Sequence, residues 1–96
     1  MKDAKEELRT RLLQHSSRVS EIFIGWNASD GGPRMDVSIK ASDGSSVDEW
    51  NDWMILGNVG SHTTGADIIT NIVKEVLGSR VRLTVRGVQH LRFLVS

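Results

Sequence analysis

Three histidines are the side chains of this chain best suited to acid–base or metal chemistry: His15, His62 and His90. They fall in three separate predicted elements, and no two of them have the short spacing that metal-binding histidines show. His62 stands near hydroxyl residues and Asp67, but the local sequence supplies no second acid–base partner. The chain has no cysteine, which excludes a thiol nucleophile, a thiolate zinc site and a disulfide framework. We therefore expect a protein that is not an enzyme and that holds no metal or cofactor.

The segment from Gly60 to Asp67 has the glycine spacing of a phosphate-binding P-loop. In such loops a lysine and then a hydroxyl residue follow the second glycine. Here Ala66 and Asp67 occupy those positions, so the lysine that neutralises phosphates and the hydroxyl that binds magnesium are both missing. Backbone N–H groups at the start of the next helix could hold an anion, although Asp67 already fills that role. We therefore do not expect nucleotide hydrolysis.

Opposite charges are separated along the chain, although 12 basic and 12 acidic residues give a formal net charge of zero. Residues 41–73 contain no lysine or arginine, and residues 76–96 contain no acidic residue. The basic residues of the second stretch are Arg80, Arg82, Arg86, His90 and Arg92. We expect them on one strand face, without an aromatic neighbour, where they would bind an acidic protein surface or phosphates. The alternative is that they are solvated or form weak exposed ion pairs with Asp43, Asp48 or Asp52.

Hydrophobic periodicity predicts a single α+β domain over residues 1–96, in the order helix, strand, strand, helix, helix, strand, strand. The predicted helices cover residues 2–17, 46–54 and 65–77, and the predicted strands cover residues 20–27, 34–41 and two segments within 80–95. The second helix is predicted from a capping box, with Ser46 as the N-cap and Glu49 three residues later. We expect a four-stranded, mainly antiparallel sheet with helices on one face.

The last predicted segment, residues 80–95, alternates apolar and polar residues and is too long for one strand. A hairpin with a three-residue loop at residues 87–89 would keep the apolar residues on one face. Its register would pair Arg86 with His90, Val85 with Leu91, Leu83 with Phe93, and Val81 with Val95. The alternative is a single bent strand with a bulge near Gly87.

Two of the three tryptophans, Trp50 and Trp53, lie on the predicted helix of the acidic middle. Trp50 shares a helical face with Val47 and Met54, and we expect that face to pack inward. Trp53 is displaced around the helix and is a candidate anchor for a protein partner, because tryptophan is favoured at interface hot spots. The alternative is that both tryptophans belong to the core.

An apolar pair followed by a G-x-x-G sequence lies at Ile55 to Gly60, between the two later predicted helices. This motif, together with the order helix, strand, strand, helix, loop, helix, strand, resembles the KH domains of type II. In that family the glycine loop lets the backbone approach a nucleic-acid strand closely. The resemblance implies that Gly57 and Gly60 clamp a nucleic acid, with Asn58 and Val59 as the variable pair. KH loops usually carry a basic residue at the variable positions, and this loop has none.

The composition is that of a soluble globular domain, with 39% hydrophobic and 25% charged residues. No apolar run is long enough for a membrane helix, and the charged start of the chain is not a signal peptide. Together with the absence of cysteine, this favours a cytoplasmic protein without membrane contact. We therefore predict a small non-enzymatic protein–protein interaction module, such as an adaptor, inhibitor or immunity-type factor, including phage-encoded ones. The alternative is a nucleic-acid-binding KH-like domain that uses the arginine face, and the separated charges also suit a homo-oligomer.

Overall fold

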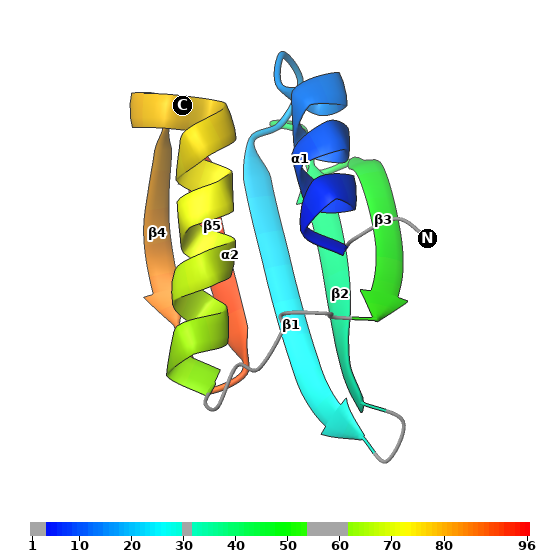
Figure 1. Ribbon diagram of the computed structural model, residues 1–96. Helices are drawn as coiled ribbons and strands as arrows, with labels where there is room; N and C mark the ends of the chain where they lie inside the picture. Colours follow the sequence, from blue (N-terminus) through cyan, green and yellow to red (C-terminus); the bar gives the residue numbers. More distant parts are fainter. Residues whose placement is uncertain (1–3, 30–31, 54–61) are drawn as a thin grey trace.

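The structure is a computed structural model that describes residues 4–29, 32–53 and 62–96 (Figure 1). In chain order its elements are α1 (Ala4–His15), β1 (Glu21–Ser29), β2 (Gly32–Lys40), β3 (Ser46–Trp53), α2 (His62–Leu77), the short 3-10 helix η1 (Gly78–Arg80), β4 (Val81–Arg86) and β5 (His90–Val95). Within these residues the five strands form one sheet in the order β3-β2-β1-β5-β4, and every neighbouring pair is antiparallel. The fold is therefore mixed α+β, with β1 as the central strand.

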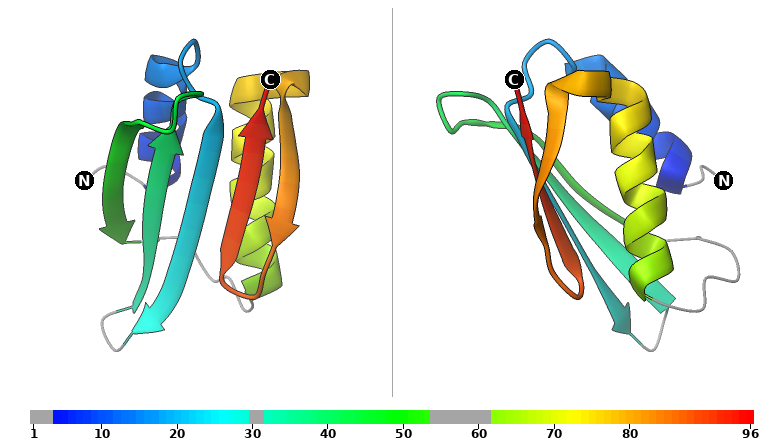
Figure 2. Two further views of the ribbon diagram at one scale, coloured as in Figure 1. Left: turned by 180° about the vertical axis from the view of Figure 1, so that it is seen from behind. Right: turned by 90° about the vertical axis from the view of Figure 1, so that its left-hand side faces the viewer.

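Both α-helices lie on the same side of the sheet, so the fold has two layers (Figure 2). The helices contact each other; α1 also contacts β3, and α2 contacts β4 and β5. The predicted arrangement of helices on one face is therefore confirmed. Since successive strand side chains point to opposite faces, the alternation along each strand decides which residues the helices cover.

The core lies between the helices and the covered side of the sheet, which we call the inner face. The inner-face residues that are buried are Ile22, Ile24 and Trp26 on β1, Met35, Val37 and Ile39 on β2, Leu91, Phe93 and Val95 on β5, and Val81 on β4. From the other layer, α1 adds a narrow stripe of Ala4, Leu8 and Leu12, at the i, i+4, i+8 spacing of one helical face. α2 adds Ala66, Ile69, Ile72, Val73 and Leu77. β1, β2 and β5 therefore bury one set of alternate residues and leave the other set uncovered by the helices.

Residues 46–53 form the edge strand β3, so the short helix predicted there and the four-stranded sheet are both wrong. The register places Trp50 opposite Val37 and Glu49 opposite Ser38. A capping box can satisfy only a few backbone groups at a helix start. Pairing with β2 binds the backbone along the whole segment, and it packs Trp50 against the core, which outweighs the local signal.

The predicted C-terminal hairpin is confirmed, with β4 and β5 joined by residues 87–89. Near its open end the register is also as predicted, because Val81 lies opposite Val95 and Leu83 opposite Phe93. A bulge at Thr84 then shifts the pairing by one residue. Thr84 donates a hydrogen bond from its hydroxyl to the carbonyl of the opposite strand at Arg92, over 3.1 Å.

The bulge reverses the sides to which the next two residues point, as bulges do. Val85 lies opposite Arg92 instead of Leu91 and is 39% exposed, so the prediction that it faces the core is wrong. Arg86 lies opposite Leu91 instead of His90, and its guanidinium reaches Asp67 of α2 over 2.9 Å. Arg86 is therefore separated from the other arginines of the predicted basic face.

Two neighbouring leucines of α1 test this packing directly, since Leu12 is fully buried and Leu13 is 62% exposed. Leu12→Ala should lower the free energy of unfolding by about 2–5 kcal/mol, because it removes buried methyl groups and leaves a cavity. Leu13→Ala, the matched control, should change it by less than about 0.5 kcal/mol. Urea denaturation followed by tryptophan fluorescence measures both values. Similar losses for the two variants would contradict the placement of α1.

Candidate functional site

The side of the sheet opposite the helices is the only large surface on which strand side chains stand uncovered within the described residues (Figure 2). We call it the outer face. Its residues are Glu49 and Asn51 on β3; Asp36, Ser38 and Lys40 on β2; Glu21, Phe23 and Gly25 on β1; His90, Arg92 and Leu94 on β5; and Arg82 and Val85 on β4. These residues come from all five strands, so their arrangement depends on the order of the strands in the sheet.

Phe23 lies on the central strand of the outer face and is 40% exposed. The register places Arg92 directly beside it on β5, with the guanidinium carbon 5.5 Å from the centroid of the ring. The guanidinium also makes an ion pair with Glu21, to which its Nε donates a hydrogen bond over 3.0 Å. A cation held over an aromatic face and against a carboxylate is restrained from two directions. The three side chains thus form an ordered, partly apolar centre for the face.

The outer face carries charges of both signs. Asp36 on β2 and Glu49 on β3 supply carboxylates, and neither has an ion-pair partner in the described part of the chain. Arg82, His90 and Arg92 stand on β4 and β5. Lys40 of β2 also lies on this face, and Arg92 is paired with Glu21 of β1, so the charge separation seen along the sequence is only partly kept in space.

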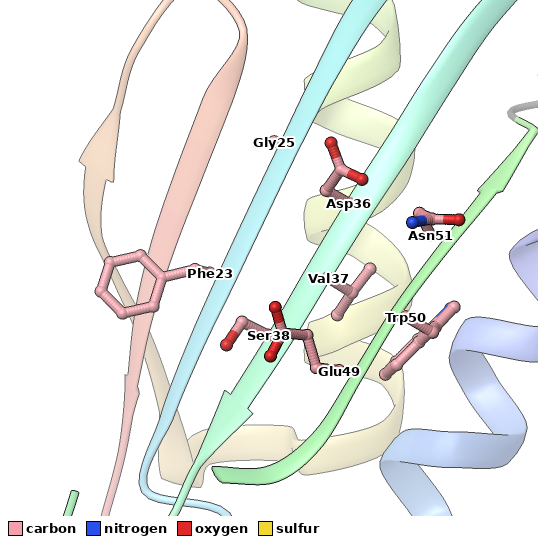
Figure 3. A pocket seen from close by; sticks show the side chains of 8 residues that line it. All are labelled: Phe23, Gly25, Asp36, Val37, Ser38, Glu49, Trp50 and Asn51. Carbon is pink, nitrogen blue, oxygen red and sulfur yellow. The ribbon is translucent and has the colours of Figure 1, made fainter.

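A shallow hollow lies over β1, β2 and β3 (Figure 3). It is lined by Phe23, Gly25, Asp36, Val37, Ser38, Glu49, Trp50 and Asn51. Gly25 lies between Asp36 and His90 in the register, and it has no side chain to fill the space between them. A Cβ atom at Gly25 would have its nearest contact at 3.8 Å, with the carbonyl oxygen of Gln89. The fold thus has room for a side chain there, and the small residue keeps the middle of the face low.

The structure brings together three members of the predicted basic set: Arg82, His90 and Arg92. Arg86 points to the inner side of the sheet, as described above. Arg80 belongs to η1, and its Nε donates a hydrogen bond to the carbonyl of Ser96 over 3.1 Å. The single basic face predicted from alternation is therefore smaller than expected.

The other predicted site residues fall largely outside the described part of the chain. Trp53 belongs to β3, and its Cα lies opposite Arg34, but its side chain is not described. The glycine loop of Gly57, Asn58, Val59 and Gly60 lies wholly outside the described residues. The segment that precedes this loop is β3, where the KH resemblance implies a helix.

Sequence reasoning did not find the aromatic centre of the face. Phe23 points away from Ile22 and Ile24, and the basic face was expected to have no aromatic neighbour. The neighbour comes from the pairing of β1 with β5, which joins residues that are far apart in the chain. No local pattern signals that pairing, so the contact between Phe23 and Arg92 required the structure.

A second polar cluster joins α1 to the edge strand β3 on the inner side. Arg11 donates hydrogen bonds to Glu7 over 2.7 Å and to Asp48 over 3.0 Å. Its guanidinium carbon also lies 4.5 Å from the centroid of the Trp50 ring. His15 Nε2 lies 3.0 Å from the second carboxylate oxygen of Asp48. Since these groups bind one another across two elements, the cluster fastens α1 to β3.

The environment of this cluster shifts two ionisation equilibria. Burial is the largest influence on Asp48 and opposes ionisation, but the hydrogen bond from His15 and the charge and hydrogen bond of Arg11 together hold its pKa below the ordinary 3.8. The hydrogen bond to Glu7 raises the pKa of Arg11 above its ordinary value. Both shifts favour the charged forms that hold the cluster together.

In residues 4–29, 32–53 and 62–96, no three His, Asp or Glu side chains are grouped so that they could hold a metal ion. Neither described α-helix is long and apolar enough to cross a bilayer. Comparison with protein-family models, curated proteins and solved structures finds no match. Inferences about function therefore depend on the chain's own residues.

Acid titration tests the role of Asp48. Because its folded pKa is lowered, its stabilising effect is present above the ordinary value of 3.8 and is lost as the pH falls through the folded pKa. Asp48→Asn should lower the free energy of unfolding at neutral pH by about 1–3 kcal/mol. It should also flatten the loss of stability that the wild type shows below about pH 4.

The matched control is Glu75→Gln, which removes the exposed pair between Arg9 and Glu75 of α2. It should cost no more than about 1 kcal/mol and leave the acid dependence as in the wild type. Urea denaturation at a series of pH values measures both variants. An unchanged acid dependence in Asp48→Asn would contradict the proposed contribution of the cluster.

Proposed function

We propose that this chain is a small protein-binding module without enzymatic activity, and that the outer face is its contact surface. The observation that supports this most strongly is the position of Phe23, an exposed ring among carboxylate and guanidinium groups of the same face. Aromatic residues and arginine are enriched at protein interfaces. Complementary charges around such a centre steer a partner and fix its orientation.

The sheet edges are less suitable than the face for binding a partner. The edge strand β4 carries the bulge at Thr84 together with Arg82 and Arg86. Bulges and charged residues on an edge strand discourage the addition of another strand. The opposite edge, β3, contacts α1 through the cluster of Arg11 and Asp48. We therefore place the partner on the face and keep Trp53 as a predicted further anchor.

An adaptor, inhibitor or immunity-type role in the cytoplasm is the setting we propose for such a module. A domain of 96 residues with a binding face on one side and its core on the other has room for one contact surface of ordinary size. Its specificity would come from the order of charges along the face, since bulk hydrophobicity does not distinguish transient interfaces from other surfaces.

Nucleic-acid binding is the second candidate, and one observation favours it. Phe23 shares the outer face with Arg82 and Arg92, so an unpaired base could stack on the ring while phosphates meet the guanidinium groups. The carboxylates of Asp36 and Glu49 stand on the same face and would repel phosphates. A protein partner is therefore the better match to the whole face.

Affinity capture tests the proposal with variants that separate the two faces of the fold. The wild type and Leu13→Ala, which removes an exposed apolar side chain on the helical side, should retain the same protein from a lysate of the source organism. Phe23→Ala should lose most of it, because the variant removes the ring at the centre of the face. Treatment of the lysate with nuclease should leave capture unchanged.

Two results would contradict the protein-binding proposal. Equal capture by Phe23→Ala and the wild type would show that the outer face is not the contact surface. Capture that disappears with nuclease and falls steeply with salt would instead support the nucleic-acid candidate. In that case Arg82→Glu should weaken binding to single-stranded nucleic acid in a direct titration.

A further inference from the structure

A second hollow lies at the end of the sheet where β1 and β4 begin and β5 ends. Its lining includes two arginines, three serines and a leucine: Arg80, Arg82, Ser20, Ser79, Ser96 and Leu94. No acidic residue lines it. Only Arg82 and Leu94 belong also to the outer face, so most of this hollow is separate from the contact surface proposed above. A concave surface with several polar side chains is a place where a small ligand can bind.

Backbone hydrogen bonds fix both sides of this hollow. The N–H of Val95 donates to the carbonyl of Ser20 over 2.9 Å, and the N–H of Ser96 donates to the carbonyl of Arg80 over 2.9 Å. Gly78 has a φ of 61°, which ends α2 in the left-handed conformation, and η1 then returns the chain to the sheet. The sheet therefore sets the positions of the lining residues on β4 and β5.

The two arginines of this hollow have no carboxylate partner among the described residues. Arg82 makes no hydrogen bond or ion pair there. Arg80 donates from its Nε to the carbonyl of Ser96 over 3.1 Å, which orients the guanidinium and leaves its terminal nitrogens without a partner in the described part of the chain. Four other described arginines are each paired with a carboxylate: Arg9, Arg11, Arg86 and Arg92. Positive charge therefore lines this hollow without compensation.

The carboxylate of Glu21 lies in the same row of the sheet but does not neutralise this charge. The strand registers place Leu94 between Glu21 and Arg82. The carboxylate is instead paired with Arg92, whose Nε donates to it over 3.0 Å. Residues 76–96 contain no acidic residue, so the strands β4 and β5 offer no closer partner.

A phosphate group has the chemistry that this hollow recognises. On a monoester it carries a charge of about −1.5 to −2 at pH 7 and three strong acceptor oxygens. Guanidinium groups match phosphate oxygens with paired N–H donors. The hydroxyls of Ser20 and Ser79 add two further donors, and neither has a hydrogen-bond partner in the described part of the chain. A carboxylate has a smaller charge and fewer acceptors, so it uses less of this donor set.

We propose that the hollow at the end of β5 binds a phosphate group, either as free phosphate or on a small phosphomonoester. This inference goes beyond the proposed function, because it assigns a small ligand to a site that requires no protein partner. Both arginines are exposed, so salt screens their attraction and the affinity falls as the chloride concentration rises.

An NMR titration of ¹⁵N-labelled protein with sodium phosphate tests the site, with sodium chloride adjusted to hold the ionic strength constant. The amide signals of residues 79–82 and 94–96 should shift and saturate. Arg82→Gln should weaken binding about tenfold, because it removes an unpaired guanidinium from the hollow. Arg9→Gln is the matched control, since it removes an exposed arginine that is paired with Glu75 on the helical side. It should bind phosphate like the wild type.

A parallel titration with glycerol phosphate distinguishes the two sources of the phosphate group. Tighter binding of the ester identifies a phosphomonoester as the ligand, and tighter binding of inorganic phosphate identifies the free ion; either result supports the site. Shifts that rise linearly without saturation, or that spread over all the basic residues, would overturn it. So would an Arg82→Gln variant that binds like the wild type. If the site fails while Phe23→Ala still abolishes capture from the lysate, the proposed function stands.

Discussion

The helices of this protein supply enough apolar surface to cover one side of a five-stranded sheet, and the rest of the structure follows from that constraint. α1 contributes only the stripe of Ala4, Leu8 and Leu12, and α2 packs beside it on the same side. The strands therefore turn most of their apolar residues inward, with Phe23 and Val85 as exposed exceptions. Whatever occupies the remaining positions is left on the outer face, where it is free to bind something else.

The outer face gains its order from contacts between distant parts of the chain. The ion pair between Glu21 and Arg92 spans 71 residues, and it exists because β5 lies beside β1. The same pairing brings the guanidinium to the ring of Phe23. The outer face thus combines an aromatic ring with charged groups that come from distant parts of the chain. Charge order, more than apolar area, is the property by which this surface would distinguish its partners.

Much of the fold could be predicted from local pattern, and the failures have identifiable physical causes. Strict alternation correctly gave β1, β2 and the C-terminal hairpin, and a wide apolar face gave α2. The helix prediction for residues 46–53 was wrong because a capping box is a local signal, while β3 is stabilised by its pairing with β2. The prediction that Val85 faces the core was wrong because the bulge at Thr84 interrupts the alternation, and no glycine marks the bulge in the sequence. The contact between Phe23 and Arg92 could not be predicted, because it depends on the order of the strands, which is a property of the whole chain.

The most direct test of the account is a measurement of which aromatic rings the solvent reaches. A soluble paramagnetic probe, added to dilute protein during NMR, broadens protons in proportion to their exposure. We expect strong broadening of the ring protons of Phe23 and almost none for Phe93, which is fully buried on the inner face. Equal protection of the two rings in the monomer would show that both sides of the sheet are covered, and it would contradict a binding face on the outer side.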